Sequence, residues 1–252
     1  MYYFNNKTMN ESVWFNMHSL YGLQQTQFTY LYLLFQNTSP TYGQRSLLLS
    51  RSTFAGSGQY AGHWLGNNKC TYDDMRHSIS GIMNFQMFGV PFIGANICGT
   101  TGDFNQEICG RWYQLGAFYP FARSFPNDTS GKREVWALDE KYRTAAKNAL
   151  TLRLSLLRYF YTVFFEMYKN GGSFWKPLFF EFPESDEALK DIEHTFMIGS
   201  SLKLTPVLKP VTETEKIKSY FPANTRFINL IDWKTIIDGG ASGKNEEIQP
   251  SW

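Results

Sequence analysis

The chain has 252 residues, of which 43% are hydrophobic, 17% aromatic and 18% charged, and its formal net charge is +2 at pH 7. This length is enough for one sizeable core, or for most of one core and part of another. The small net charge and the lack of any Lys/Arg run argue against a nucleic-acid partner, because phosphate binding needs clustered cations, and no apolar window is long enough to predict a membrane span.

The first part of the chain predicts a long helix and then a buried strand. Residues 10–36 carry apolar side chains at roughly helical spacing, and the helix is expected to end before Pro40. Residues 46–50 (SLLLS) form a short apolar run between polar residues, which is typical of a strand buried on both faces. A glycine-rich segment, residues 51–68, follows that strand directly.

A second helix is predicted after this segment. Thr71 and Asp74 have the spacing of a capping box, and the helix is expected to stop at Gly89. Its predicted buried face carries Met75, Ile79, Ile82 and Met83. Residues 90–95 then predict a second buried strand, followed by a polar, glycine-bearing loop at 96–103 and a helix at 104–118.

The remainder predicts one very long helix and then shorter elements. The helix covers residues 139–169, and its predicted buried side carries Ala145, Ala149, Leu152, Leu156, Phe160 and Phe164. Further elements are expected as a strand at 176–182, an acidic helix at 186–194 and a strand at 202–208. From residue 210 the pattern changes to short alternating segments separated by turns, as in Phe227 to Ile231, which indicates the start of a β-domain.

Strand, loop and helix repeat about four times, which predicts an α/β fold with parallel strands. In a (β/α)8 TIM barrel the loops after the strands gather at the catalytic face, and a whole barrel takes roughly 250 residues. Four units make half a barrel. We therefore expect residues 1–209 to form the second half of a TIM barrel, with the rest upstream of Met1, and residues 210–252 to begin a β-sandwich domain.

The glycine-rich segment, RSTFAGSGQYAGHWLGNN, is the strongest candidate for a ligand site. It has four glycines, the rings of Phe54, Tyr60, His63 and Trp64, and the cation of Arg51, without any helical or strand period. Rings beside hydrogen-bonding groups suit a sugar, which has apolar faces and hydroxyl edges. An ordinary glycine-rich surface loop is the alternative.

Neither a metal nor a cofactor is expected. The three cysteines, Cys70, Cys98 and Cys109, do not have metal-ligand spacing. The first residues lack the pattern of a signal peptide, so Met1 is not expected to be the natural start if the protein is secretory. Four Asn-x-Ser/Thr sequons would suit a lumenal protein but also arise by chance in an Asn-rich chain; they begin at Asn6, Asn10, Asn37 and Asn127.

Several long motifs occur in a fixed order along the chain. They read NMHSLYGLQQTQFTY, RSTFAGSGQYAGHWLGN, FGVPFIGANICG, RWYQLGAFYPFAR, ALTLRLSLLRYFYT, KPLFFEFP and LKLTPVL. This series resembles the second half of the catalytic barrel of glycoside hydrolase family 31, the α-glucosidase, maltase and sucrase-isomaltase group. The resemblance covers roughly residues 14 to 230, and the number of motifs in one order makes it specific.

The resemblance implies a retaining hydrolase that removes α-linked glucose from non-reducing ends with two carboxyl groups, one a nucleophile and one an acid/base. In the family the nucleophile lies in a Trp-x-Asp-Met-Asn-Glu segment, which is absent from this chain and would lie just N-terminal to it. The acid/base is the last residue of GHWxGD, and Asn67 takes its place here. An amide cannot deliver a proton at neutral pH, and the loss of a positioned general acid costs about 10²–10⁴ in rate.

Other sugar-binding positions are implied in the same way. Arg51 and Trp64 match an arginine and a tryptophan of the family's site, and His63 lies beside the tryptophan. Asn96 stands where the family has the Asp of GADxCG, Phe125 aligns with a sugar-contacting His, and Thr100 replaces an aromatic residue. The family pairs the cysteines that match Cys98 and Cys109 in a disulfide, which leaves Cys70 free; three reduced thiols are the alternative.

Two functions remain open from the sequence. The first is an α-glucosidase-type hydrolase acting on α-glucoside oligosaccharides, here incomplete, which the resemblance places in the secretory pathway, in the lysosome or outside the cell. The second is a catalytically inactive paralogue or fragment that binds glycans, or that pairs with the missing N-terminal half or with an active paralogue. Asp73, Asp74 and Asp103 are weak candidates for a replacement acid, because acidic residues in a first helical turn are explained by the helix dipole.

Overall fold

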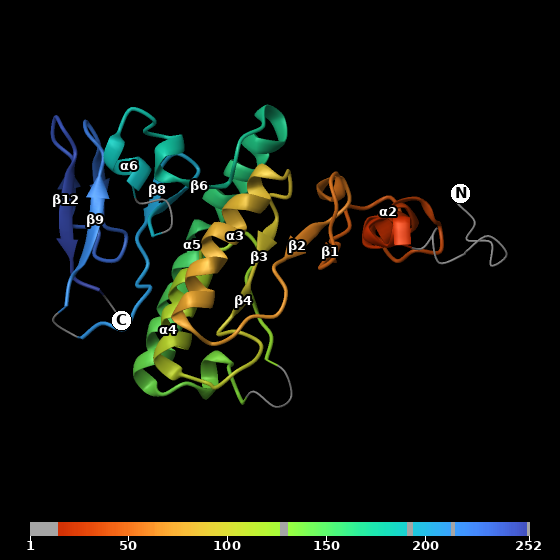
Figure 1. Cartoon of the computed structure of the whole chain (residues 1–252), viewed down its shortest axis with the longest axis horizontal. Coiled ribbons are helices and arrows are strands. Elements are labelled where there is room, and N and C mark those ends of the chain that lie inside the picture. Colours follow the sequence, from red (N-terminus) through yellow and green to blue (C-terminus); the bar gives the residue numbers. More distant parts are fainter. Residues whose placement is uncertain (1–14, 127–130, 191–193, 213–214, 251–252) are drawn as a thin grey trace.

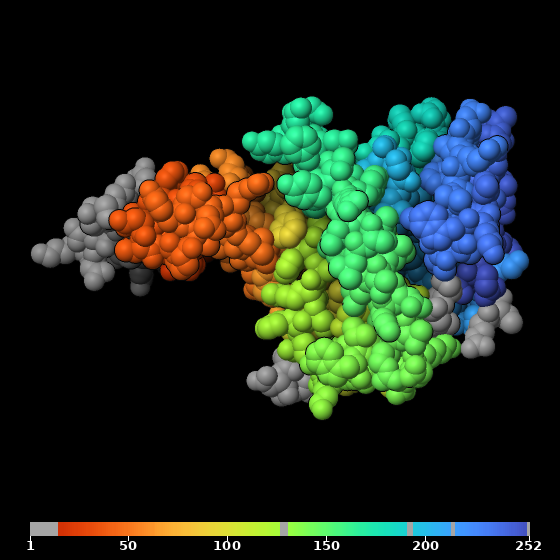
Figure 2. All heavy atoms as spheres, turned by 180° about the vertical axis from the view of Figure 1, so that it is seen from behind, coloured from red at the N-terminus to blue at the C-terminus, as the bar shows by residue number. Residues whose placement is uncertain are grey.

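The computed structural model describes residues 15–126, 131–190, 194–212 and 215–250. Helix α2 (Tyr21–Phe35), preceded by a 3-10 turn η1 (His18–Leu20), protrudes at one end of the molecule. Helices α3 (Tyr72–Met87), α4 (Gln106–Gly116) and α5 (Glu140–Asn170) form the central layer, and the ladder of β9 with β12 lies at the opposite end (Figures 1 and 2). The predicted first helix is thus confirmed within the described residues, and residues 10–14 lie outside them.

Two small parallel sheets lie between α2 and the helical layer. Strands β1 (Leu49–Ser50), β2 (Gly62–Trp64) and β3 (Ile93–Gly94) pair in that order, and β4 (Asn96–Ile97) pairs with β5 (Arg123–Ser124). Parallel pairing agrees with the predicted β/α architecture, but these strands do not close a barrel among the described residues.

The prediction that residues 46–50 are buried on both faces is wrong. None of these residues is buried, and Leu47 is 70% exposed. Strand β1 covers only Leu49–Ser50, so residues 46–48 lie outside it, and it is an edge strand that pairs only with β2 among the described residues.

Helix α3 begins and ends as its local sequence predicts. The Thr71 hydroxyl accepts the backbone N–H of Asp74 at 3.1 Å. The Asp74 carboxylate accepts the backbone N–H of Lys69 at 2.6 Å, two residues before the N-cap Thr71 whose N–H it would accept in the standard capping box. Gly89 has φ 79° beyond the helix end, and the four predicted core residues Met75, Ile79, Ile82 and Met83 are buried.

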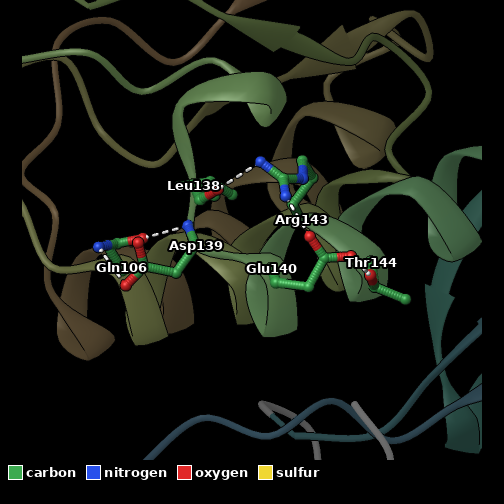
Figure 3. A network of polar contacts seen from close by, with 6 residues as sticks. All are labelled: Gln106, Leu138, Asp139, Glu140, Arg143 and Thr144. Carbon is green, nitrogen blue, oxygen red and sulfur yellow. Dashed lines mark hydrogen bonds and ion pairs between the residues drawn. The ribbon is translucent and has the colours of Figure 1, made fainter.

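The start of α5 is tied to the start of α4 by side-chain hydrogen bonds (Figure 3). The side chain of Gln106 accepts the backbone N–H of Asp139 at 2.6 Å and donates to its carboxylate at 2.9 Å. One turn later Arg143 pairs with Glu140 and donates to the carbonyl of Leu138. The bonds of Gln106 satisfy the backbone N–H of the N-cap residue Asp139 and fix the start of α5 alongside α4.

The main core lies between the central helices and the strands they cover. It is rich in aromatic side chains, including Trp112, Trp175, Phe174 and Phe196, all without exposed surface. On α5, Ala145 and Phe160 of the predicted buried side are buried, and the other four predicted residues are half-buried.

The predicted third and fourth strands do not belong to a parallel sheet. Strands β6 (Trp175–Pro177), β7 (Phe196–Ile198) and β8 (Leu202–Leu204) form an antiparallel sheet in sequence order, and the 3-10 turn η4 (Leu178–Phe180) ends the predicted strand early. The connection of three residues between β7 and β8 allows only antiparallel pairing of these two strands, since a parallel crossover needs about a dozen or more residues. A short helix, α6 (Asp186–Lys190), lies between β6 and β7.

The C-terminal segment is made of short β-strands, as predicted. Strand β9 (Ile217–Phe221) pairs antiparallel with β12 (Lys244–Ile248), and β10 (Arg226–Ile228) pairs antiparallel with β11 (Ile236–Asp238). Among the described residues these are two separate two-stranded ladders, so the predicted sandwich is not seen. The predicted domain boundary at residue 210 stays a prediction.

Two helices expose large apolar side chains. On the outer side of α5 these side chains recur every three to four residues, namely Leu154, Leu157, Tyr161, Phe165 and Tyr168. The protruding helix α2 exposes Tyr21, Phe28, Leu31, Tyr32 and Phe35. No helix in the described part of the chain is long and apolar enough to cross a membrane.

Candidate functional site

Strand β2 places the two neighbouring rings of the glycine-rich segment on opposite faces. His63 is buried, its Nδ1–H donates to the carbonyl of Ser50 at 2.7 Å, and its ring stacks on Phe85 with 4.2 Å between centroids. Trp64 is half-buried and points to the other face, because successive side chains of a strand alternate. His63 is therefore a core residue that supports the strand, separated from Trp64.

Trp64 lies between two arginines. The guanidinium carbon of Arg123 is 4.3 Å from the centre of the Trp64 ring, and that of Arg51 is 5.8 Å away. Both distances fall within the range of a cation–π interaction. Arg123 also lies 4.7 Å from the ring of Phe125, whose side chain is 51% exposed. The cluster thus presents aromatic faces and guanidinium donors side by side.

Gly66 makes room for this arrangement. Its φ is 91°, which L side chains rarely adopt, and a Cβ there would lie 3.1 Å from Nε of Arg51. The backbone conformation therefore favours glycine at this position, and a larger residue would in addition press on the Arg51 side chain.

Asn96, at the start of β4, links residues of the cluster through hydrogen bonds of its side chain. Its Oδ1 accepts hydrogen bonds from Nε and Nη2 of Arg123 at 3.0 and 2.8 Å. Its Nδ2 donates to Oγ1 of Thr100 at 2.6 Å and to the carbonyl of Gly66 at 3.3 Å. Asn68 donates to the Asn96 carbonyl at 2.9 Å. With no exposed surface, Asn96 uses all of its side-chain hydrogen-bonding capacity to join the two loops.

The loop after β4 is fixed by a disulfide and by a buried arginine. Cys98 and Cys109 are bonded, with their Cα atoms 4.5 Å apart, which confirms the predicted pair, and Cys70 is the free, buried cysteine. Burial raises the pKa of the Cys70 thiol. Arg133 is fully buried and donates to the carbonyls of Cys98, Gly102 and Thr101 at 2.5, 2.7 and 3.3 Å.

Asn67 lies exposed at the rim, between Gly66 and Asn68. None of the three aspartates considered as replacement acids has a described contact with Arg51 or Arg123. The Asp74 carboxylate accepts the Lys69 backbone N–H, and that of Asp73 lies 3.9 Å from the Arg76 guanidinium. Asp103 is exposed in the loop closed by the disulfide. None of the ion pairs within the described ranges involves Arg51 or Arg123. The described site is therefore rich in cations and amides and has no carboxylate beside its arginines.

The burial of the site perturbs two of its groups. Burial lowers the pKa of Arg123. Burial also lowers the pKa of His63, against the opposing effect of the hydrogen bond to Ser50, and the charge of Arg51 lowers it further. A neutral His63 and the charged arginines are the ionisation states expected near pH 7. Within the described residues, no group of three or more His, Cys, Asp or Glu side chains could hold a metal ion.

Sequence reasoning missed two arginines that build the site, the half-buried Arg123 and the fully buried Arg133. Arg123 had a signal, because it is the single charge after the apolar run GAFYPFA and it directly starts β5. Arg133 stands in a polar linker beside Lys132, where a charged residue is ordinarily exposed. Its burial follows from the carbonyls of a distant loop, which only the folded chain shows.

An apolar cavity lies away from this cluster, between α3 and β6, lined by Met83, Met87, Trp175 and Phe179 among others. It contains few polar groups and none of the sequence-predicted site residues. The chemistry of the cluster around Trp64, rather than the shape of this cavity, therefore identifies the candidate site.

Comparison with known proteins agrees with the family resemblance. Residues 2–163 match the model of the glycosyl hydrolases family 31 TIM-barrel domain, and residues 171–248 match that of the family's C-terminal domain. The chain is 40% identical to a probable α-glucosidase of Oryza sativa subsp. japonica over 88% of its length, and 40% identical to the lysosomal α-glucosidase of Mus musculus over 85%. It spans only 24% and 22% of those two relatives.

A solved structure shares the fold. The crystal structure of a glucosidase II alpha subunit superposes on 93% of the chain with a TM-score of 0.84 and 30% sequence identity, and the match covers 25% of that subunit.

Proposed function

From the premise that the chain belongs to glycoside hydrolase family 31, we propose that it recognises the terminal sugar of an α-glucoside at the cluster of Arg51, Trp64, Asn96, Arg123 and Phe125. One observation carries the proposal: strands β2, β4 and β5 and the residues directly after β1 and β5 bring these side chains together, with Arg51 and Arg123 against the Trp64 ring and Asn96 bonded to Arg123. An aromatic face can cover the apolar side of a hexose, while a guanidinium supplies donors to its hydroxyls.

Hydrolysis by the retaining mechanism needs two carboxyl groups about 5–5.5 Å apart. The position that the family resemblance assigns to the acid/base is Asn67, and the nucleophile segment of the family does not occur in these 252 residues. We therefore propose recognition without turnover for the chain on its own. The Cys98–Cys109 disulfide supports an oxidising compartment such as the secretory pathway.

Two measurements on the purified chain test this function. In the first, hydrolysis of an aryl α-glucoside should stay at background for the wild type and for Asn67→Asp, because restoring one carboxyl does not supply the nucleophile. Release of the aryl group above background by the wild type would refute the assignment of Asn67.

The second measurement is a calorimetric titration with maltose. Trp64→Ala should weaken binding about tenfold, which corresponds to about 1.4 kcal/mol of lost contact. The matched control is Trp233→Ala, which removes an exposed indole from the β10–β11 turn. Equal heats for Trp64→Ala and the wild type would remove the cluster from consideration.

A second candidate is a non-catalytic partner subunit. The outer side of α5 favours it, because contiguous exposed apolar surface marks protein interfaces. A Tyr161→Lys substitution at its centre should lower the mass measured by light scattering if this face is covered in solution. A chain that is monomeric at all concentrations, alone and with an active α-glucosidase, would argue against this role.

A further inference from the structure

Two positions at which this chain departs from the family resemblance are bonded to each other. Asn96 stands in the place of an aspartate, and Thr100 stands in the place of an aromatic residue. Nδ2 of Asn96 donates to Oγ1 of Thr100 at 2.6 Å, and both residues are buried. An aromatic ring at position 100 would offer this N–H no such acceptor, and a buried donor without a partner is costly. The amide and the hydroxyl therefore form a matched pair.

The Thr100 hydroxyl also closes a ring of hydrogen bonds with the loop after β2. It donates to Oδ1 of Asn68 at 3.4 Å, and Nδ2 of Asn68 donates to the backbone carbonyl of Asn96 at 2.9 Å. The backbone N–H of Thr100 donates to the carbonyl of Asn68 at 2.7 Å. Because the hydroxyl gives its proton to Asn68, its lone pairs are left to accept the N–H of Asn96.

This ring fixes which way the Asn96 amide faces. Its N–H groups are turned towards Thr100 and towards the carbonyl of Gly66. Its Oδ1 is therefore turned towards Arg123, whose Nε and Nη2 donate to it at 3.0 and 2.8 Å. A flipped amide would set its N–H groups against the donors of Arg123 and its oxygen against the Gly66 carbonyl. Arg123, held in this way, lies 4.3 Å from the centre of the Trp64 ring.

We infer that Thr100 is a positioning residue of the sugar site: through the Asn96 amide its hydroxyl holds Arg123 against Trp64, and the affinity for the sugar depends on that hydroxyl. The inference rests on the proposed function, which assigns the sugar to Trp64 and Arg123. The described hydrogen bonds of Thr100 go to Asn96 and Asn68, so its effect needs no contact of its own with the ligand. One buried hydrogen bond between neutral groups corresponds to about a two- to tenfold change in affinity.

The test on the ligand-free chain follows the NMR signal of the Arg123 Nε–H, assigned by its absence from Arg123→Lys. Thr100→Val removes the hydroxyl and keeps nearly the same shape, so this signal should shift and its proton should exchange faster with water. Thr100→Ser keeps the hydroxyl and should leave the signal in place. The matched control is Thr101→Val, which removes a neighbouring hydroxyl that donates to the backbone carbonyl of Asn68 at 3.4 Å, and it should also leave the signal in place.

The test of sugar affinity is a calorimetric titration of maltose into the same proteins. Thr100→Val should bind maltose about fivefold more weakly than the wild type. Thr100→Ser and Thr101→Val should bind it within about twofold of the wild type, because both keep the hydroxyl at position 100. If Thr100→Val does not fold, Thr100→Ala takes its place in both measurements.

The outcomes separate this inference from the proposed function. A wild type that does not bind maltose would overturn the proposed function, and the inference with it. Equal maltose affinities of the wild type and Thr100→Val would overturn the inference and leave the proposed function standing. An Arg123 Nε–H signal that stays in place in Thr100→Val would overturn the route through Asn96. Equal losses of affinity in Thr100→Val, Thr100→Ser and Thr101→Val would assign the effect to packing of the loop and would also overturn the inference.

Discussion

Replacing Arg133 by Met should lower the free energy of unfolding and make the loop after β4 less rigid. Residue 133 has no described contact with Trp64 or Arg51. The buried guanidinium donates to three carbonyls of the loop after β4. Thr101 O keeps a second donor, the Cys70 N–H, but Cys98 O and Gly102 O have no other donor among the described residues. The Cys98 carbonyl belongs to a residue without exposed surface, and the loss of its partner costs about 1–3 kcal/mol, with hydrogen bonds to charged groups at the upper end, whereas Gly102 is exposed and water can replace the lost donor.

Part of this cost is offset, because methionine does not require the burial of a charge. We therefore expect a net loss of about 2 kcal/mol. With a urea m-value of about 3 kcal/mol/M, the unfolding midpoint should shift down by about 0.7 M. Urea titration followed by circular dichroism measures the shift, and Arg133→Lys should recover part of it, since an ammonium supplies donors without the fork. The control Arg158→Met, on the exposed side of α5, should change stability by less than about 0.5 kcal/mol. An Arg133→Met variant that unfolds at the wild-type urea midpoint would refute the stabilising role of the hydrogen bonds from Arg133 to the loop after β4.

Three further outcomes follow from buried groups of the same region. The double variant Cys98→Ser/Cys109→Ser should lose about 3 kcal/mol of stability in urea titration, the loop-closure value for a separation of 11 residues, and should not respond to reductant. Cys70→Ala keeps the disulfide and should lose stability with reductant as the wild type does; identical midpoints with and without reductant in the wild type would contradict this. His63 has a folded-state pKa below its ordinary value of 6.5, so the unfolded chain takes up its proton first as the pH falls. The wild type should therefore lose stability below about pH 6.5, and His63→Gln should show a smaller loss over that range. The Cys70 thiol, buried and with a raised pKa, should resist iodoacetamide at pH 8 in the folded protein and react after unfolding, as read by mass spectrometry.

Local signals in the sequence were enough for the helices. Thr71 caps α3 and Met75 to Met83 form its buried face, because capping and helical period depend on residues within a few positions of one another. The strands were less predictable. The apolar run at 176–182 has the composition of a buried parallel strand, yet β6 pairs antiparallel with β7, because the direction of pairing depends on the partner strand in the fold and not on the composition of the run.

The site was predictable where one motif holds it and not where two loops meet. Arg51 and Trp64 come from the same glycine-rich segment, and the structure places them together. His63 was expected beside Trp64, but strand alternation turns it into the core. Arg123 and Arg133 gain their roles from Asn96 and from the carbonyl of Cys98, residues 27 and 35 positions away, and no local pattern contains such a contact.

The disulfide makes a covalent ring of the segment from Cys98 to Cys109, and within that ring Gly102 and Asp103 are exposed. A protease that cuts the backbone at this accessible point would leave the two pieces linked through sulfur. On a denaturing gel the nicked molecule would migrate as a single band until a reductant separated it into two. Any preparation checked only without reductant would thus pass as intact, while its polypeptide had already been severed next to the residues that support Asn96.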